Sequence, residues 1–333
     1  MKFSLIICTY MRPEAIIKLL KSVEKQELYP NEILIIDGST DDKTTIVLKE
    51  NKFKKLNYFK VDDANRGLTK QRNFGIDRVS ENMEVVCFLD DDIILEEPYF
   101  KNLINTYKLY PDAGGVGGYI LNEVKWRLLK KGGKPSFKEF EIDGYIRNLG
   151  SRNVLRKRLG LLSDQPPCIM PEFSNGFSVG SLPPSDKTYK AEYFMGGVSS
   201  FKKKVVDTVK FSEYFEGYGL YEDLEYCLRV SKSYQLYVNT SATLYHYHEE
   251  GGRPNKYAYG KMVVRNGWYV WCTKFPKPSF KARLKWNAIV IILSILRFIH
   301  VLTTSKRKEA FTEGIGRFVG LFILFFSKPK IQR

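Results

Sequence analysis

Residues 85–92 have the sequence VVCFLDDD, in which five apolar residues run directly into three aspartates. An uninterrupted apolar run of this length is typical of a strand that is buried on both faces of a parallel sheet. The three carboxylates after it repel one another unless a cation or hydrogen-bond donors neutralise them. We interpret Asp90, Asp91 and Asp92 either as a divalent-metal site or as an acidic helix cap, and the run alone leaves both interpretations open.

The segments before this strand alternate between strand and helix patterns. The predicted strands are 2–8, 33–36 and 57–61, and the predicted helices are 13–23 and 67–79. Such alternation predicts an α/β fold, a Rossmann-like, mostly parallel sheet flanked by helices. Ligands of these sheets bind beyond the carboxyl ends of the strands, where Thr9, Asp37 and Asp90 are expected to meet.

A later acidic motif, YEDLEYCLR at residues 221–229, can supply a catalytic carboxylate. On a helix, Glu222, Glu225 and Arg229 share one face, so part of the acidity is expected to be paired. Asp223 lies off that face and is predicted to have no such partner, which leaves it free to accept a proton. An ordinary acidic helix start is the simpler explanation of the motif taken alone.

Two of the three histidines of the chain, His246 and His248, lie in the sequence YHYHEEGGR at residues 245–253. A neutral imidazole can ligate a metal through one ring nitrogen. A surface strand with alternating polar side chains accounts for the same pattern, and the motif alone favours that interpretation.

The positive charge of the chain is concentrated at its carboxyl-terminal end. Of the formal net charge of +16, residues 274–333 contribute +11, from thirteen basic and two acidic residues. The apolar runs 286–302 and 311–326 lie between these charges, which favours a membrane surface over nucleic acid as the partner. As a helix each run spans about 25 Å, less than the roughly 30 Å hydrocarbon core, and Arg297 and Arg317 interrupt them.

We therefore expect amphipathic helices that lie in the interface of an anionic membrane. Packing against the rest of the chain or a second subunit, and a membrane-spanning hairpin, stay open as alternatives. The apolar stretch at residues 1–8 is too short for a signal peptide, so a cytoplasmic protein is expected.

Residues 122–190 lose clear periodicity and are predicted to form a long insertion at the rim of the substrate site. The insertion contains the basic cluster Arg152, Arg156, Lys157 and Arg158. A phosphorylated or lipid-linked substrate would suit this cluster, and a solvated surface explains it equally well.

The order of the motifs along the chain resembles glycosyltransferase family 2. The resemblance rests on CTYMRP at 8–13, IIDGSTD at 35–41, QRNFGI at 71–76, the aspartates at 90–92, Gly196 and Gly197, EDLE at 222–225 and a late histidine. Each motif is weak alone, but the ordered set is specific and covers about residues 2–270. The resemblance implies an A-type glycosyltransferase fold and an inverting transfer of a sugar from a nucleotide-sugar to a hydroxyl of a glycan or lipid-linked acceptor.

The resemblance also implies roles for individual residues. Contacts with the nucleotide-sugar are implied for Thr9, Arg12, Asp37, Arg72, Asp90 and Asp91. Asp92 and His246 would ligate Mn²⁺ or Mg²⁺, with His248 as a reserve ligand, and Asp223 would be the general base. The acceptor side would include Gly196, Gly197 and Glu222.

The changes in periodicity and charge along the chain further predict three parts. Residues 1–121 would be the nucleotide-sugar-binding half, 122–273 the acceptor-side half with its insertion at 122–190, and 274–333 basic helices that dock on the membrane or join two copies. The chain departs from the pattern at Ile36, where the family usually has an aspartate. The QxxRW signature of processive synthases does not follow Asp223, which predicts a non-processive enzyme. The resemblance and the basic helices together imply an enzyme of polysaccharide biosynthesis on the inner face of the membrane.

Two other functions fit some of these features. A sugar-phosphate nucleotidyltransferase would also use a nucleotide crevice and a carboxylate-bound metal, but the turn after its first strand would be rich in glycine, unlike residues 8–13. A noncatalytic membrane-docking protein of the same fold would be expected to lose charge at Asp92 or Asp223, and both aspartates are present.

Overall fold

The computed structural model describes residues 1–333 apart from 216, 249–253 and 332–333. The chain forms two compact units. The first consists of Met1–Trp126 and Ser178–Gly252, and the second of Arg127–Phe177 and Arg253–Arg333. The division into three parts expected from the sequence stays a prediction.

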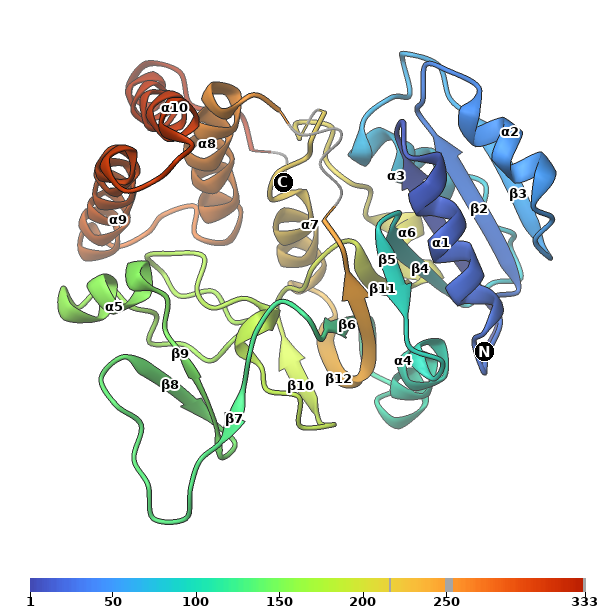
Figure 1. The fold of residues 1–333 in the computed structure, drawn as a ribbon, viewed down its shortest axis with the longest axis horizontal. Helices are drawn as coiled ribbons and strands as arrows, with labels where there is room; N and C mark the ends of the chain where they lie inside the picture. The colour runs from blue at the N-terminus through green and yellow to red at the C-terminus, as the bar shows by residue number, and fades with distance from the viewer. Residues whose placement is uncertain (216, 249–253, 332–333) are drawn as a thin grey trace. The chain divides into compact units, whose positions relative to one another are not determined.

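The described part of the first unit is built on a nine-stranded sheet (Figure 1). Its strands, in spatial order, are β10 (Thr188–Ala191), β12 (Gln235–His246), β6 (Ala113–Ile120), β11 (Val198–Lys202), β4 (Val85–Asp90), β1 (Phe3–Thr9), β2 (Glu32–Asp37) and β3 (Leu56–Lys60), with β5 (Ile93–Leu95) beside β12. The strands β3, β2, β1, β4, β6 and β12 run in one direction, whereas β11, β10 and β5 run the opposite way. The prediction of a mostly parallel sheet flanked by helices is confirmed.

Helices cover both faces of this sheet because apolar side chains point to both sides. The helices of the first unit are α1 (Pro13–Glu24), α2 (Lys43–Glu50), α3 (Leu68–Ile76), α4 (Tyr99–Leu109), α6 (Lys203–Thr208) and α7 (Glu222–Val230), with a short 3₁₀ turn η1 (Val179–Ser181). Leu5 and Ile7 of β1 share one buried cluster with the apolar residues of α1 and α4. Ile6 and Ile36 face the other way, toward Gly75 of α3, where a side chain larger than hydrogen would collide with Ile6.

The register of the sheet aligns the polar ends of its central strands. Thr9 of β1 lies beside Asp37 of β2, and Cys8 lies beside Asp90 of β4. Because these strands are parallel, their carboxyl ends meet at one edge, as expected for the ligand side of an α/β sheet. His246 reaches the same region from the end of β12, where it pairs with Ile93 of β5.

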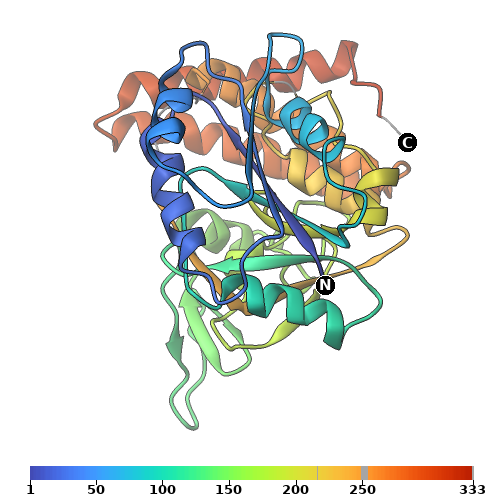
Figure 2. The ribbon, with the colours of Figure 1, turned by 90° about the vertical axis from the view of Figure 1, so that its right-hand side faces the viewer.

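The second unit combines the insertion with the carboxyl-terminal helices. Its elements are β7 (Arg127–Leu128), β8 (Glu139–Ile142), β9 (Tyr145–Asn148), α5 (Ser151–Arg158), α8 (Lys256–Lys274), α9 (Phe280–Ile299), the 3₁₀ turn η2 (His300–Leu302) and α10 (Arg307–Phe326). Figures 1 and 2 show α8, α9 and α10 close together, coloured orange to red. Trp271 of α8 donates from Nε1 to the carbonyl of Glu172 over 2.7 Å, which joins the insertion to these helices.

The helices α8 and α10 pack backbone against backbone. A β-carbon at Gly260 of α8 would overlap the carbonyl oxygen of Glu313, and one at Gly316 of α10 would overlap that of Tyr257. Glycine is therefore required at both positions for this close approach.

Arg297 and Arg317, which interrupt the apolar runs in the sequence, lie within α9 and α10 and share one acidic partner. Nη2 of Arg297 lies 2.7 Å from Oε2 of Glu313, and Nη2 of Arg317 lies 2.8 Å from Oε1 of the same carboxylate. Glu313 is buried, so the two cations are turned inward and neutralised in part within the helix bundle.

Within the described residues, one helical segment, Phe280–Leu302, is long and apolar enough to cross a membrane. Its mean hydropathy is 1.7, and 17% of the window is buried. Length and composition do not separate a span from a helix that lies in the membrane interface, so the predicted interfacial location stays a prediction.

Candidate active site

Asp91, which directly follows β4, contacts the end of β1 and the turn after it. Its Oδ2 atom accepts a hydrogen bond of 2.7 Å from Thr9, and its Oδ1 atom lies 2.8 Å from Nη1 of Arg12. Burial raises the pKa of Asp91 to about 6, although Arg12 and Thr9 oppose the shift. Both oxygens of this carboxylate thus have donors within the protein, and the side chain holds the rim of the site together.

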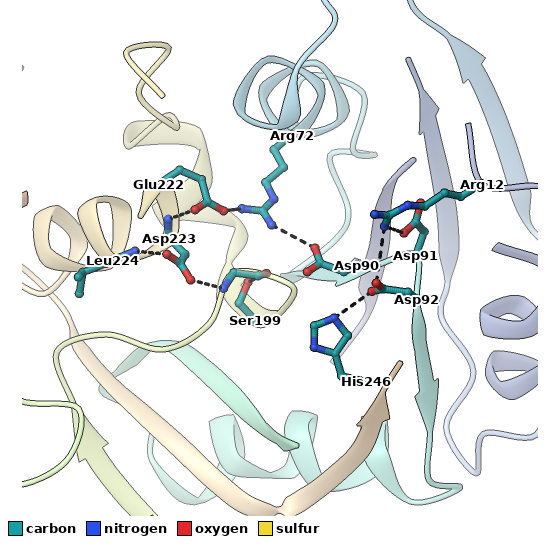
Figure 3. A network of polar contacts seen from close by, with 11 residues as sticks. Arg12, Arg72, Asp90, Asp91, Asp92, Ser199, Glu222, Asp223, Leu224 and His246 are labelled. Carbon is teal, nitrogen blue, oxygen red and sulfur yellow. Dashed lines mark hydrogen bonds and ion pairs between the residues drawn. The ribbon is translucent and has the colours of Figure 1, made fainter. Parts of the chain in front are cut away.

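Asp90, Asp92 and His246 form a group that can hold a metal ion (Figure 3). One ligand atom from each of the three side chains lies within 4.8 Å of the others, and Nε2 of His246 is 3.0 Å from Oδ1 of Asp92. Burial lowers the pKa of His246, but hydrogen bonds to Asp92 and Glu123 outweigh it and raise the pKa to about 10. Two carboxylates and one imidazole are a donor set that suits Mn²⁺ or a similar divalent cation.

Two residues at the start of the predicted insertion hold His246 in place. Asn122 exchanges two hydrogen bonds with the backbone of His246, of 2.8 and 3.0 Å. Glu123 lies 3.2 Å from Nδ1 of the imidazole, which turns Nε2 toward Asp92. Neither residue was identified from the sequence, because their separation of 124 and 123 residues from His246 leaves no local pattern.

His248 occupies a different position from His246. Its Nε2 atom lies 3.4 Å from Glu123, and these two residues with His246 form a second, more exposed group of possible ligands. The motif continues into residues 249–253, which lie outside the described residues.

Arg72 connects the aspartate cluster to the acidic motif of α7. Its guanidinium forms a close ion pair with Glu222 and lies 3.5 Å from Oδ1 of Asp90 (Figure 3). Phe211 lies beneath the guanidinium, 5.1 Å away, so the cation is enclosed by an aromatic ring and two acids. Burial and the neighbouring Asp223 raise the pKa of Glu222 to about 8, against the opposing effect of Arg72.

Asp223 stands at the first turn of α7 with both oxygens held by backbone amides. The amide of Gly196 donates to Oδ2 over 3.1 Å, and the amide of Leu224 donates to Oδ1 over 2.7 Å. Asp223 is expected to lack a basic partner at helical spacing on α7, and its donors are backbone amides of the helix start and of a neighbouring loop. The expected pairing within α7 is found between Glu225 and Arg229, at 2.7 Å, whereas Glu222 turns to Arg72 instead.

Gly196 and Gly197 allow the loop before β11 to pass directly behind the acidic side chains. A β-carbon at Gly197 would overlap the carboxylate of Asp90, and one at Gly196 would press on Arg72 and Asp223. The amide of Asp90 also donates to the carbonyl of Gly197 over 3.0 Å. These glycines therefore fix the spacing between the aspartate cluster and Asp223.

Asp37 is fully buried at the end of β2. The hydroxyl of Tyr58 donates to its Oδ2 atom over 2.8 Å, and the amide of Ser39 donates to its Oδ1 atom over 2.8 Å. Asp37 thus shapes the turn beside Thr9. It is separated from Asp90 by one strand, because β1 lies between β2 and β4.

Comparisons with known proteins agree with this fold and indicate a glycosyltransferase. Residues 4–167 match the model of the family described as "Glycosyl transferase family 2". A glucosyl-dolichyl phosphate glucuronosyltransferase of Haloferax volcanii is 29% identical over 126 residues, which are 36% of this chain and 39% of that protein. A GalNAc(5)-diNAcBac-PP-undecaprenol beta-1,3-glucosyltransferase of Campylobacter jejuni is 30% identical over 144 residues, 42% of this chain and 45% of that protein. The match thus spans less than half the length of either relative.

Among solved structures, a mannosyltransferase of Pyrobaculum calidifontis in complex with GDP-Man and Mn²⁺ superposes with a TM-score of 0.55. The alignment covers 98% of this chain and 88% of the other at 12% identity, so this likeness concerns the fold alone. The ordered motifs and the family model therefore agree that residues 4–167 of this chain form a glycosyltransferase family 2 domain.

Proposed function

We propose that this protein is an inverting, metal-dependent glycosyltransferase that moves a sugar from a nucleotide-sugar to an acceptor hydroxyl without processive polymerisation. The observation that carries the proposal is the position of Arg72, which contacts both Asp90 and Glu222. One buried cation thus joins the two acidic motifs that are more than a hundred residues apart, and both reactants can be held at one site.

The metal is proposed to bind at Asp92 and His246, with Asp90 beside them. The carboxylate and imidazole donors fit a divalent ion. Glu123 contacts Nδ1 of the imidazole, and carboxylates commonly orient metal-binding histidines through this contact. When bound, such an ion would neutralise the diphosphate leaving group as a Lewis acid. Mn²⁺ and Mg²⁺ both suit these donors.

Asp223 is proposed as the general base that accepts the proton of the attacking hydroxyl. Its carboxylate is oriented by the amides of Gly196 and Leu224, which leaves lone pairs for a substrate proton. Glu222 and the two glycines Gly196 and Gly197 would then border the acceptor. A base that is held in one orientation contributes more than a mobile one, because the reacting atoms meet in a fixed geometry.

The nucleotide-sugar is proposed to lie along the edge formed by Thr9, Arg12, Asp37, Arg72 and the first two aspartates of the cluster. Arg12 lies 2.8 Å from Asp91 and 3.6 Å from Asp92, so its guanidinium borders the metal group. A cation at that position can bind diphosphate oxygens. Thr9, Asp37 and Asp91 would act mainly by shaping this edge, because each is buried and hydrogen-bonded within the protein.

We further propose a glycan or lipid-linked acceptor and a location on the cytoplasmic face of a membrane, in polysaccharide biosynthesis. The names of the two relatives, which include a dolichyl phosphate and an undecaprenol diphosphate, support a lipid-linked acceptor. The exposed apolar and basic helices α9 and α10 support membrane attachment. They also offer a surface through which two copies could associate.

A calorimetric screen of nucleoside diphosphates with Mn²⁺ and Mg²⁺, followed by the matching nucleotide-sugars, tests this function. We expect one nucleoside diphosphate to bind only when a divalent ion is present. We also expect the protein to transfer the sugar of the matching nucleotide-sugar to an acceptor in a cell extract. Binding of none of them in the presence of either ion would contradict the proposal.

A further inference from the structure

The carboxyl-terminal helices enclose a pocket that the glycosyltransferase site does not use. Its volume is about 330 Å³, and it lies entirely within the second unit, between α8, α9, α10 and the segments that follow α8 and α10. The pocket is lined by Trp268, Trp271, Cys272, Pro276, Pro278, Arg283, Trp286, Asn287, Leu321, Leu324, Phe325 and Lys328. Three of the four tryptophans of the chain are among these residues.

The polar side of the pocket carries two cations without an acidic partner. Among the residues that the structure describes, no carboxylate lies within ion-pair distance of Arg283 on α9 or of Lys328 just after α10, in contrast to Arg297 and Arg317. Arg283 donates from Nε to the carbonyl of Pro278 over 3.1 Å, which leaves its terminal nitrogens available. Lys328 lies over the ring of Trp268, 6.0 Å from its centroid. Two cations that line one pocket attract an anion.

The apolar side of the pocket is aromatic and continues onto the surface. Trp271 and Trp286 stack with their ring centroids 5.1 Å apart, and this stack forms a rigid wall. Phe325, which also lines the pocket, is 74% exposed, and Phe326 beside it is 77% exposed. Aromatic side chains next to cations are typical of segments at the level of lipid headgroups.

We propose that this pocket binds the headgroup phosphate of an anionic membrane phospholipid. The phosphate would accept hydrogen bonds from Arg283 and Lys328, while the acyl chains would lie along Phe325 and the exposed side of α9 and α10. Such a site recognises one lipid molecule, beyond the general attraction of a basic tail to a negative surface. The inference extends the membrane attachment proposed above and is independent of the nucleotide-sugar chemistry.

Vesicle binding by the full chain tests the proposal. Sedimentation with vesicles of phosphatidylcholine, with and without phosphatidylglycerol, measures affinity, and intrinsic fluorescence reports on the pocket because it holds three of the four tryptophans. The test variant combines Arg283→Gln with Lys328→Gln. The matched control combines Lys306→Gln with Arg307→Gln, which removes the same two charges from exposed positions outside the pocket.

The two double variants separate a lipid site from general electrostatic attraction. We expect the pocket variant to lose at least about tenfold more affinity for phosphatidylglycerol vesicles than the control variant, and to lose the lipid-induced fluorescence change. Equal losses in the two variants, or no binding by the unmodified protein, would overturn the proposal. A fluorescence change with inorganic phosphate alone, of the same size as with vesicles, would overturn the lipid assignment.

Thermal unfolding of both variants checks that they are folded. Nucleoside diphosphate binding, measured in parallel, should be unchanged in both, because neither Arg283 nor Lys328 belongs to the proposed catalytic site. If the unmodified protein binds nucleoside diphosphate but not vesicles, the lipid proposal fails. If it binds vesicles but no nucleoside diphosphate, the proposed glycosyltransferase function fails.

Discussion

His246, at the end of β12, places its Nε2 atom 3.0 Å from Oδ1 of Asp92, which follows β4. This contact brings together two residues that are far apart in the sequence. If the pair holds a divalent ion, Asp92→Asn and His246→Gln should each weaken Mn²⁺ binding about a hundredfold, because each removes one ligand. Electron paramagnetic resonance of free Mn²⁺ measures the affinity.

The matched control for this prediction is His248→Gln, which leaves Asp92 and His246 in place and should bind Mn²⁺ nearly as well as the unmodified protein. A larger loss for His248→Gln than for Asp92→Asn would move the metal to the group of Glu123, His246 and His248.

The pH dependence of metal binding follows from the protonation of His246. Without a metal, its pKa is raised above the ordinary value to about 10, so the ring carries a proton at neutral pH. A metal ligand must be deprotonated, so the ion has to displace this proton. We expect the apparent Mn²⁺ affinity to rise as the pH rises toward 10, by up to about tenfold per pH unit. Calorimetry in buffers of different ionisation enthalpy should detect release of about one proton per ion, and binding without proton release would contradict the prediction.

Asp223→Asn should reduce kcat by about 10²–10⁴-fold while nucleotide-sugar binding stays intact. The amide keeps the shape of the side chain but cannot accept the proton of the acceptor hydroxyl. Asp207→Asn is the control, because Asp207 is exposed on α6 and pairs with Lys203 of the same helix. Initial rates with saturating donor measure kcat, and calorimetry measures nucleotide-sugar binding. Undiminished transfer by Asp223→Asn would exclude Asp223 as the base.

Gly197→Ala should disturb the site without unfolding the protein. The added methyl group would overlap the carboxylate of Asp90, so the aspartate cluster has to shift. Overpacking of this kind costs about 1–3 kcal/mol, and we expect Mn²⁺ affinity to fall by about tenfold or more. Gly150→Ala is the control, since its methyl group would meet no atom within 4 Å. Equal affinity of the two variants would contradict the predicted contact.

Glu313→Gln should destabilise the second unit by about 3 kcal/mol, because Arg297 and Arg317 would lose their shared partner in a buried position. Glu309→Gln removes a carboxylate from the same helix, but its pair with Lys256 is long, at 3.7 Å, and partly exposed. We expect that control to change stability by less than about 1 kcal/mol. Urea unfolding followed by tryptophan fluorescence compares the two variants.

Local patterns in the chain were sufficient to predict the four parallel strands β1, β2, β3 and β4 of the sheet. The apolar run at residues 85–89 predicted a buried strand and became β4, and the alternation of strands and helices before it predicted β1, α1, β2, β3 and α3 within a few residues. Both predictions rest on interactions between residues that are close in sequence, where periodicity carries the information. The ordered motifs also agree with the family model that matches residues 4–167.

The partners of the charged side chains could not be predicted in this way, because they come from distant segments. The sequence pattern suggested Arg229 as a neighbour of Glu222, but Glu222 turns to Arg72. The two backbone amides that donate to Asp223 also leave no pattern in the sequence. Glu123 and Asn122 were missed for the same reason.

Periodicity and motif order along the chain thus determined the strands and helices of the amino-terminal part and the family of residues 4–167, since each depends on neighbouring residues. The pairing of Arg297 and Arg317 with Glu313, and the joining of Asp90 to Glu222 through Arg72, came only from the packing of remote elements. A buried charge needs a partner from whatever segment packs against it, and one-dimensional spacing does not contain that information.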